Sequence, residues 1–270
     1  RIKYLDTDPD YGVELDKVAQ LQIKLGQYDK AEDNINTALK ILEEHKKDNT
    51  RLPQYIHAIE TQARLYGIKG MFDEAQSNLD RSRKLILKAD FPIGNELSTA
   101  EELASLLIQL GKYSETDRLL NKLIPEYEKV FGATSIRLTD PLVNKGRILL
   151  AKGDYTEAEK IAQRANQNAV KTYTDKSTKT APTQKLLSDL YYTLGDYEKA
   201  EENILKALAS QEKQFGRNHV EVAKSLSQLA LIKFHKGSNK KDVEDLMLES
   251  RDIIANKLGK DNPQYAEILK

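Results

Sequence analysis

The sequence predicts an all-α fold built as a solenoid of tandem helical hairpins. Three observations predict it: glycine-centred segments recur at a nearly fixed spacing, small and aliphatic residues recur at fixed offsets from those glycines, and the composition suits an elongated fold. The 270 residues include 31% charged residues but only five Phe, two Met and no Trp. The chain thus has few large apolar side chains with which to fill a single large core, so an elongated architecture fits better.

Six glycines mark the repeat. They are separated by 44, 41, 42, 42 and 42 residues: Gly26, Gly70, Gly111, Gly153, Gly195 and Gly237. A fixed period between 20 and 50 residues is the sequence signature of a repeat architecture. Each glycine lies between two segments with helical apolar periodicity, where the chain must leave the first helix through a left-handed residue. The unit is therefore a helix-turn-helix hairpin.

Residues at fixed offsets from the glycines predict how neighbouring helices pack. Seven residues before each glycine lies a small residue: Ala19, Ala63, Ala104, Gly146, Ser188 or Ala230. Five residues before it lies a branched aliphatic residue: Leu21, Leu65, Leu106, Ile148, Leu190 or Ile232. The small residue lets two helices approach closely, and we expect the aliphatic side chain to fill the space beside it.

The elements follow in order along the chain. The first helices of hairpins one and two open near Pro9 and Pro53, because proline suits a first helical turn. Hairpin three ends at Phe131-Gly132, and Pro125 inside its second helix predicts a kink. Hairpin four opens near Ile136. The following lysine-rich segment, residues 171–179, is expected to be a solvated loop between repeats.

The last two hairpins are bounded in the same way. Hairpin five ends at Phe215-Gly216, and hairpin six opens near Val220 and ends at Leu258-Gly259. Its second helix shows a register slip of one residue, which a longer turn would explain. Another first helix opens near Pro263, and residues 2–4 suggest the tail of an earlier second helix. We therefore expect residues 1–270 to form a single solenoid fragment of about six hairpins, with partial repeats at both ends.

The order of a small residue followed by a G-x-Y/F-x-x-A-E segment resembles the tetratricopeptide repeat (TPR). The 42-residue period and the phrase QFGRNHVEVAKSLSQLA resemble the longer subtype of kinesin light chains, which also occurs in bacterial proteins carrying a caspase-like CHAT protease domain. The resemblance implies a right-handed α-solenoid whose concave wall is lined by the first helix of each hairpin. In kinesin light chains, asparagines two residues before the small residue grip a cargo peptide, and here only Asn144 matches them.

The composition narrows the function. The chain has 42 basic and 42 acidic side chains and no cysteine. This balance argues against a partner that is a nucleic acid or an anionic membrane. None of the four histidines pairs with another at the spacing that places two metal ligands on one helix face, and no nucleophile motif is present. We expect a cytoplasmic protein without a bound metal, without a cofactor and without enzymatic activity.

Hairpins four to six carry the candidate partner-binding residues. Projected onto the inward face of the first helices, they combine apolar, cationic and amide side chains: Asn144, Arg147, Leu150, Lys185, Asp189, Tyr192, Lys224, Gln228, Leu231 and Phe234. Such a set predicts an amphipathic surface for an acidic and hydrophobic peptide or helix. The alternative is that the apolar members pack adjacent repeats together.

The sequence thus predicts a protein-protein interaction scaffold that binds a peptide or helical segment of a partner in the concave groove. The partner would be a protein or peptide, including a domain of the same full-length chain. One alternative is a sensor or regulatory arm that controls an attached effector, such as a caspase-like CHAT protease. A second is a peptide-pheromone receptor in which the repeats gate another module.

Overall fold

The computed structural model describes residues 7–48, 50–89, 104, 108, 113–174 and 176–268. All the regular secondary structure of these residues is helical, as the sequence predicts. The chain divides into two compact units, Arg1–Leu106 and Leu107–Lys270, and each is described by itself. A single continuous solenoid over the whole chain stays a prediction.

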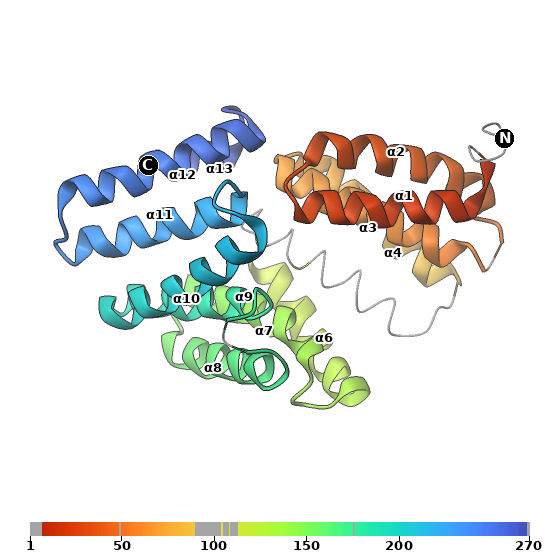
Figure 1. Cartoon of the computed structure of the whole chain (residues 1–270). Helices are drawn as coiled ribbons and strands as arrows, with labels where there is room; N and C mark the ends of the chain where they lie inside the picture. Colours follow the sequence, from red (N-terminus) through yellow and green to blue (C-terminus); the bar gives the residue numbers. More distant parts are fainter. Residues whose placement is uncertain are drawn as a thin grey trace. The chain divides into compact units, whose positions relative to one another are not determined.

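Up to residue 89, the described part of unit 1 forms two helical hairpins (Figure 1). Its helices are α1 (Pro9–Lys24), α2 (Tyr28–His45), α3 (Leu52–Lys69) and α4 (Phe72–Ala89). Helices α1 and α2 pack together, as do α3 and α4, and the two hairpins meet where α2 packs against α3. Each hairpin therefore buries one face against its neighbour in the chain, which is the packing rule of a solenoid.

Unit 2 continues the same pattern. Its helices are α6 (Tyr113–Phe131), a 3₁₀ turn η2 (Ile136–Leu138), α7 (Thr139–Lys152), α8 (Tyr155–Thr172), α9 (Ala181–Thr193), α10 (Tyr197–Phe215), α11 (Val220–His235), α12 (Lys240–Leu258) and α13 (Pro263–Ile268). Consecutive helices pack against each other along this series. The all-α fold of tandem hairpins is confirmed.

The turn glycines have the predicted left-handed backbone. The φ angles of Gly26, Gly70, Gly153, Gly195 and Gly237 lie between 69° and 80°, a region in which side chains with a Cβ atom are strained. Gly111 lies outside the described residues. The second helix begins two residues after the glycine in the other described hairpins but three residues after it in α12, so the predicted longer turn of hairpin six is confirmed.

Helix boundaries also follow the sequence signals. Proline occupies the first turn of α1, α3 and α9. Asp154 and Asp196 cap α8 and α10 by accepting hydrogen bonds from backbone N–H groups of the first turn. Helix α6 continues through Pro125, so that proline does not end the helix. Of the predicted loop over residues 171–179, residues 171 and 172 still belong to α8, and the described residues 173, 174 and 176–179 form a loop.

The small residues form a buried seam between helices. Ala19, Ala104, Ser188 and Ala230 are completely buried and Ala63 nearly so. Gly146 is the extreme case, because a Cβ atom added there would lie 2.6 Å from Cδ2 of Leu186 on α9. No larger residue fits at this contact unless the Leu186 side chain moves.

The aliphatic residue of the seam is buried as predicted in hairpins two, four, five and six but not in the first, and Leu106 of hairpin three lies outside the described residues. Leu65, Ile148, Leu190 and Ile232 are fully buried, whereas Leu21 has 58% of its surface exposed. The expectation that Leu21 fills a space between helices is therefore wrong. Leu190, for example, packs in a buried cluster with Ala158 of α8, the second helix of the preceding hairpin, and in the described part of the chain no helix precedes α1.

This difference predicts unequal effects of the same substitution at the same repeat position. We expect Leu65→Ala to lower the free energy of unfolding by about 2–5 kcal/mol, because it leaves a cavity in the seam. Leu21→Ala should change it by at most about 0.5 kcal/mol, since that side chain is already largely in water. Urea denaturation of the two variants measures this, and equal losses would contradict the assigned packing.

Candidate functional site

The predicted partner-binding residues lie on three first helices of unit 2. Asn144, Arg147 and Leu150 are on α7; Lys185, Asp189 and Tyr192 are on α9; Lys224, Gln228, Leu231 and Phe234 are on α11. Helix α7 packs directly against α9. Side-chain contacts connect α9 with α11, and we call the surface formed by these residues the first-helix face.

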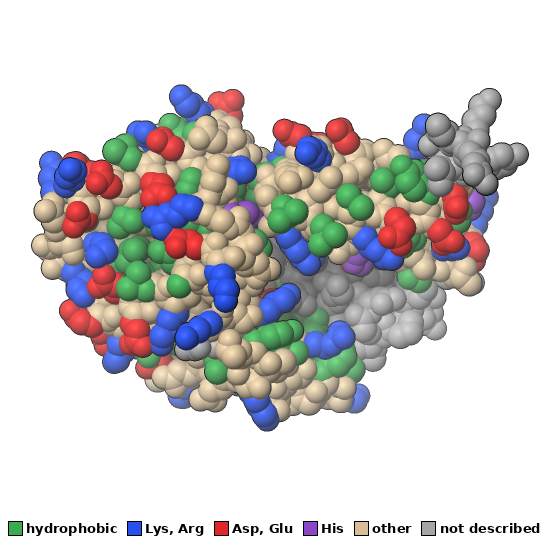
Figure 2. All heavy atoms as spheres, viewed as in Figure 1, with side chains coloured by type: hydrophobic (Ala, Val, Ile, Leu, Met, Phe, Trp, Pro, Cys, Tyr) green, Lys and Arg blue, Asp and Glu red, His purple; other side chains and the backbone are tan. Residues whose placement is uncertain are grey.

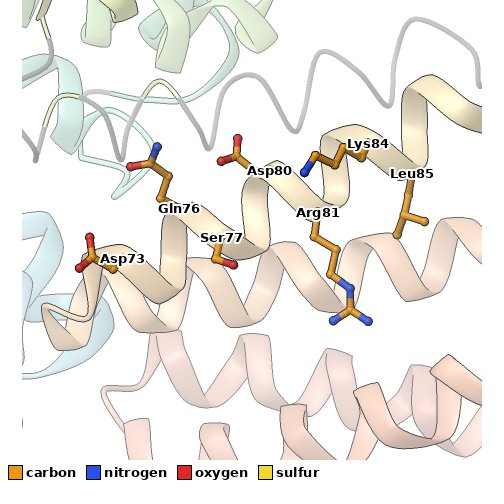
Figure 3. A pocket seen from close by; sticks show the side chains of 7 residues that line it. All are labelled: Asp73, Gln76, Ser77, Asp80, Arg81, Lys84 and Leu85. Atoms are coloured by element: carbon orange, nitrogen blue, oxygen red, sulfur yellow. The ribbon is translucent and has the colours of Figure 1, made fainter.

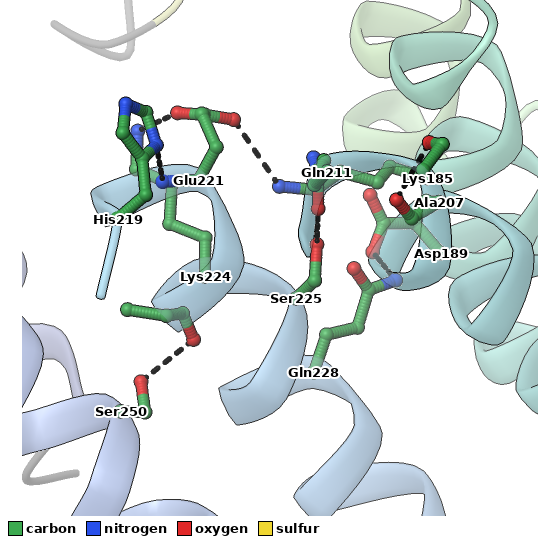
Figure 4. A network of polar contacts seen from close by, with 12 residues as sticks. Lys185, Asp189, Ala207, Gln211, His219, Glu221, Lys224, Ser225, Gln228 and Ser250 are labelled. Atoms are coloured by element: carbon green, nitrogen blue, oxygen red, sulfur yellow. Dashed lines mark hydrogen bonds and ion pairs between the residues drawn. The ribbon is translucent and has the colours of Figure 1, made fainter. Parts of the chain in front are cut away.

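Two polar contacts join α9 to α11 (Figure 4). Gln228 Nε2 donates a hydrogen bond to Asp189 Oδ1 at 2.5 Å. Lys185 Nζ lies 3.8 Å from Glu221 Oε2, and the other oxygen of Glu221 accepts a hydrogen bond from Lys224 Nζ at 2.9 Å. The structure thus brings together four of the predicted residues and adds Glu221, which the sequence projection missed.

Burial sets the electrostatics of this network. It lowers the pKa of Lys185, against the opposing pull of Glu221, because the low-dielectric surroundings disfavour the ammonium ion. Burial raises the pKa of Asp189, because the same surroundings disfavour its carboxylate ion. The nearby ammonium of Lys224 instead holds the pKa of Glu221 well below its usual range, assisted by Lys185. Lys185 is therefore a largely buried cation whose charged form is favoured by the carboxylates of Glu221 and Asp189.

Arg147 is the exposed cation of the first-helix face. Its charge acts on both Lys185 and Asp189. Within the described part of the chain, no carboxylate forms an ion pair with its guanidinium. A guanidinium is a fixed, planar set of donors that matches a carboxylate with two hydrogen bonds. Arg147 is therefore available to an acidic group from outside.

Aromatic rings gather at the turn end of α9 and α11. The ring of Tyr192 lies 5.4 Å from that of His235, which stacks on Tyr197 at 5.6 Å. Phe234 meets His235 edge to face at 5.4 Å. Phe234 nevertheless keeps 66% of its surface exposed and Leu231 keeps 44%. The large apolar side chains of Leu231 and Phe234 on α11 are thus exposed to solvent.

Two predicted residues serve the packing of unit 2 instead. Asn144 is buried, with 3% of its surface exposed. Leu150 packs against a buried cluster of Leu149, Ala158 and Leu190. The sequence analysis left open whether the apolar inward residues bind a partner or pack the repeats, and for Leu150 the packing role is evident.

In unit 1, the first helices α1 and α3 are joined by a polar contact between Asp16 and His57. His57 Nδ1 on α3 lies 2.7 Å from Asp16 Oδ2 on α1, and Gln20 Nε2 donates to the same oxygen at 3.1 Å. The hydrogen bond to Asp16 raises the pKa of His57; the charge of Glu60 acts in the same direction, while burial and Arg64 act against it. Sequence reasoning missed this pair because 41 residues separate its members.

A hollow runs along α4, lined by Asp73, Gln76, Ser77, Asp80, Arg81, Lys84 and Leu85 (Figure 3). Gln76, Asp80 and Lys84 point away from Arg81 and Leu85 in this view. The guanidinium of Arg81 lies 5.2 Å from the centre of the Tyr55 ring and forms an ion pair with Glu43 at 2.9 Å. Arg81 thus connects α4 to α2 and α3 and has a structural role.

The surface charge is mixed. On the face in Figure 2, basic and acidic side chains alternate over unit 2, at the left, with hydrophobic side chains between them. In the described part of the chain, no group of three or more His, Asp or Glu residues could hold a metal ion. None of the described helices is long and apolar enough to cross a membrane.

A family model described as tetratricopeptide repeat matches residues 137–213 and 179–253. These residues contain the first-helix face. Residues 137–253 are therefore tetratricopeptide repeats, and the fold of the chain is that of a TPR solenoid. A search of curated proteins found no significant match.

Solved structures show the same fold at low sequence identity. BtubC (BKLC) from P. vanneervenii is 16% identical, with 84% of this chain and 91% of that chain covered and a TM-score of 0.62. Repeats of a putative kinesin light chain from Podosopora anserina are 21% identical, with 76% and 97% covered and a TM-score of 0.52. NprR in complex with its cognate peptide NprX is 16% identical, with 92% and 75% covered and a TM-score of 0.63.

The His57–Asp16 pair predicts a pH dependence in unit 1. Because the pKa of His57 is raised in the folded state, the stability from this pair is fully present below about pH 6.5 and is lost as the pH rises through the folded pKa. An NMR titration should give a pKa above 6.5 for His57, and Asp16→Asn should lower it. His57→Gln should flatten the dependence of stability on pH between about 6 and 8. An unchanged titration of His57 in Asp16→Asn would contradict the assignment.

Proposed function

We propose that this chain is a non-enzymatic scaffold that binds a peptide or helical segment of a partner protein across the first-helix face of α7, α9 and α11. One observation carries the proposal. Three consecutive first helices carry the cations Arg147, Lys185 and Lys224, and the third of these helices, α11, also carries the exposed apolar side chains of Leu231 and Phe234. The surface therefore offers both a charge to pair and an apolar area to cover.

The two roles considered for this face divide among its residues. Gln228 and Asp189 connect the helices through a partly buried hydrogen bond, and Leu150 packs in the seam. Arg147 and Phe234 are exposed and take no part in these contacts. We infer that the first group keeps the helices in register while Arg147, Leu231 and Phe234 make most of the contact with the partner.

Charge indicates the chemistry of the partner. The cation of Lys185 is largely buried, and its ion pair with Glu221 spans 3.8 Å while Glu221 is also bound by Lys224. A carboxylate from a partner would compensate this buried charge and could pair with Arg147 at the same time. An acidic segment that also carries an aromatic or aliphatic side chain fits the face best.

The comparisons support a peptide as the occupant. NprR, which shares the fold, was crystallised with its cognate peptide NprX, and a Rap protein with the same fold was crystallised with Competence and Sporulation Factor. The partner of the present chain would be another protein or another domain of its own full-length chain. Binding would occur by covering the face, without any chemical step.

The exposed members of the face provide the test. We expect the double variant Arg147→Glu, Phe234→Ala to weaken capture of the partner from a lysate at least about tenfold, since it reverses the exposed charge and removes the largest exposed apolar side chain. Quantitative pull-down with the whole chain measures this. Both positions are exposed, so circular dichroism should show an unchanged helix content.

A matched variant controls for loss of charge and apolar surface in general. Arg118→Glu, Leu205→Ala changes an exposed arginine on α6 and an exposed leucine on α10, both on second helices. It should capture the same partner as the parent. Equal capture by all three proteins would place the binding surface elsewhere and overturn the proposal.

A further inference from the structure

Helix α1 of unit 1 exposes three aliphatic side chains on one side. Val18, Leu21 and Leu25 keep 41%, 58% and 54% of their surface exposed, and their spacing of three and four residues places them on the same helix face. We call this face the α1 stripe. Helix α1 packs against α2 and α3, and neither helix covers the stripe. A solenoid repeat that faces water carries a polar outer face, so the α1 stripe has the character of an interface.

The same three repeat positions face the preceding hairpin in hairpin two. They lie eight, five and one residues before the turn glycine, and in α3 they are Gln62, Leu65 and Lys69. Gln62 Nε2 donates a hydrogen bond to Asn36 Oδ1 of α2 at 2.7 Å. Leu65 is fully buried, and Lys69 forms an ion pair with Glu32 of α2. The second helix of the preceding hairpin therefore covers this side of α3.

Later hairpins use these positions in the same way. In hairpin four, Lys145 and Lys152 both form ion pairs with Asp117 of α6. In hairpin six, Lys236 Nζ lies 2.7 Å from a carboxylate oxygen of Glu201 on α10. The repeat positions of the α1 stripe thus form one half of an interface between helices, and the other half is a second helix.

Helix α9 shows what covers an entirely aliphatic set at these positions. Its residues are Leu187, Leu190 and Leu194, and with α8 in place they keep 6%, 0% and 48% of their surface exposed. Leu190 shares a buried cluster with Ala158 of α8, and Ile161 of the same helix packs against that cluster. The covering helix contributes small and aliphatic side chains to this contact.

We propose that the α1 stripe is a second docking surface, on which an amphipathic helix of a partner protein lies as α8 lies on α9. The docked helix buries Val18 and Leu21, as α8 buries Leu187 and Leu190, and leaves Leu25 partly exposed. The surface belongs to unit 1 and acts by apolar burial. It is therefore independent of the first-helix face of unit 2.

A second copy of this chain does not supply the docked helix. In the described part of the chain, the second helices α2, α6, α8, α10 and α12 each pack already against the helix that follows them. The hollow along α4 is lined by Asp73, Asp80 and Lys84 among others. Charges placed against an apolar stripe would lose water without gaining a partner. The occupant is therefore a helix of a different protein.

A synthetic peptide with the α8 sequence, residues 155–172, tests the docking on the whole chain. Because an isolated helix of 18 residues is only marginally stable, a lactam bridge between positions 163 and 167, both exposed in α8, keeps it helical. Methyl NMR of the chain labelled at valine and leucine should show shifts of Val18, Leu21 and Leu25, with a dissociation constant of about 10–1000 μM.

Two variants of the chain locate the binding. Leu21→Glu places a charge in the centre of the α1 stripe and should weaken binding of the peptide at least about tenfold. Leu205→Glu changes a leucine on α10 that is 44% exposed and should bind the peptide as the parent does. Both leucines already lie largely in water, so circular dichroism should show the parent helix content for each variant.

A charge swap tests the register of the docked helix. At the position of Leu25, Lys69, Lys152 and Lys236 each pair with the acidic residue six positions after the preceding turn glycine. The peptide carries Glu159 at that position. Leu25→Lys should therefore strengthen binding about two- to fivefold relative to Leu25→Gln. A peptide with Glu159→Gln should lose this gain.

Several outcomes would overturn the proposal. They are the absence of shifts in the α1 stripe with a peptide shown to be helical, equal binding by Leu21→Glu, and no gain from Leu25→Lys. A parent that sediments as a dimer and a Leu21→Glu variant that sediments as a monomer would identify a second copy as the occupant instead. The variant Arg147→Glu, Phe234→Ala should bind the peptide like the parent, so the first-helix face is tested separately.

Discussion

The structure depends on one constraint: a helical hairpin cannot bury its apolar face alone and must bury it against the next hairpin in the chain. The seam of small residues and aliphatic residues meets this constraint, with Leu65, Ile148, Leu190 and Ile232 fully buried at one repeat position. Because each hairpin contacts only its neighbours, stability arises as a sum of local seams. Leu21 occupies the same repeat position in the first hairpin, and it stays exposed because no described helix covers it.

Charge acts as a second layer over this apolar seam. Partly exposed ion pairs such as Lys69–Glu32 and Lys236–Glu201 join neighbouring hairpins, and each contributes little energy individually. In the network of Lys185, Glu221 and Lys224, the Lys185 side chain is largely buried, whereas those of Glu221 and Lys224 remain partly exposed. Burying charges costs free energy unless each finds a partner, and Lys185 is only loosely compensated. A face that is incompletely satisfied in the free protein is well suited to bind a segment that completes it.

Packing and binding use the same helices here. The first helices α7, α9 and α11 turn one side of their surface to the seam and leave Arg147, Leu231 and Phe234 in water. This arrangement couples the two roles, because any change in the angle between hairpins also changes the spacing of the exposed residues.

The sequence alone determined the helices, their turns and the period, because these depend on local signals: glycine at left-handed positions, proline in first turns, and apolar spacing within one helix. It also placed the candidate residues on three first helices. Only the tertiary structure decided which of them are buried, that Glu221 joins Lys185, and that His57 meets Asp16 across 41 residues. Exposure and pairing depend on the neighbouring hairpin, and a helical period read from one segment carries no information about what lies against it.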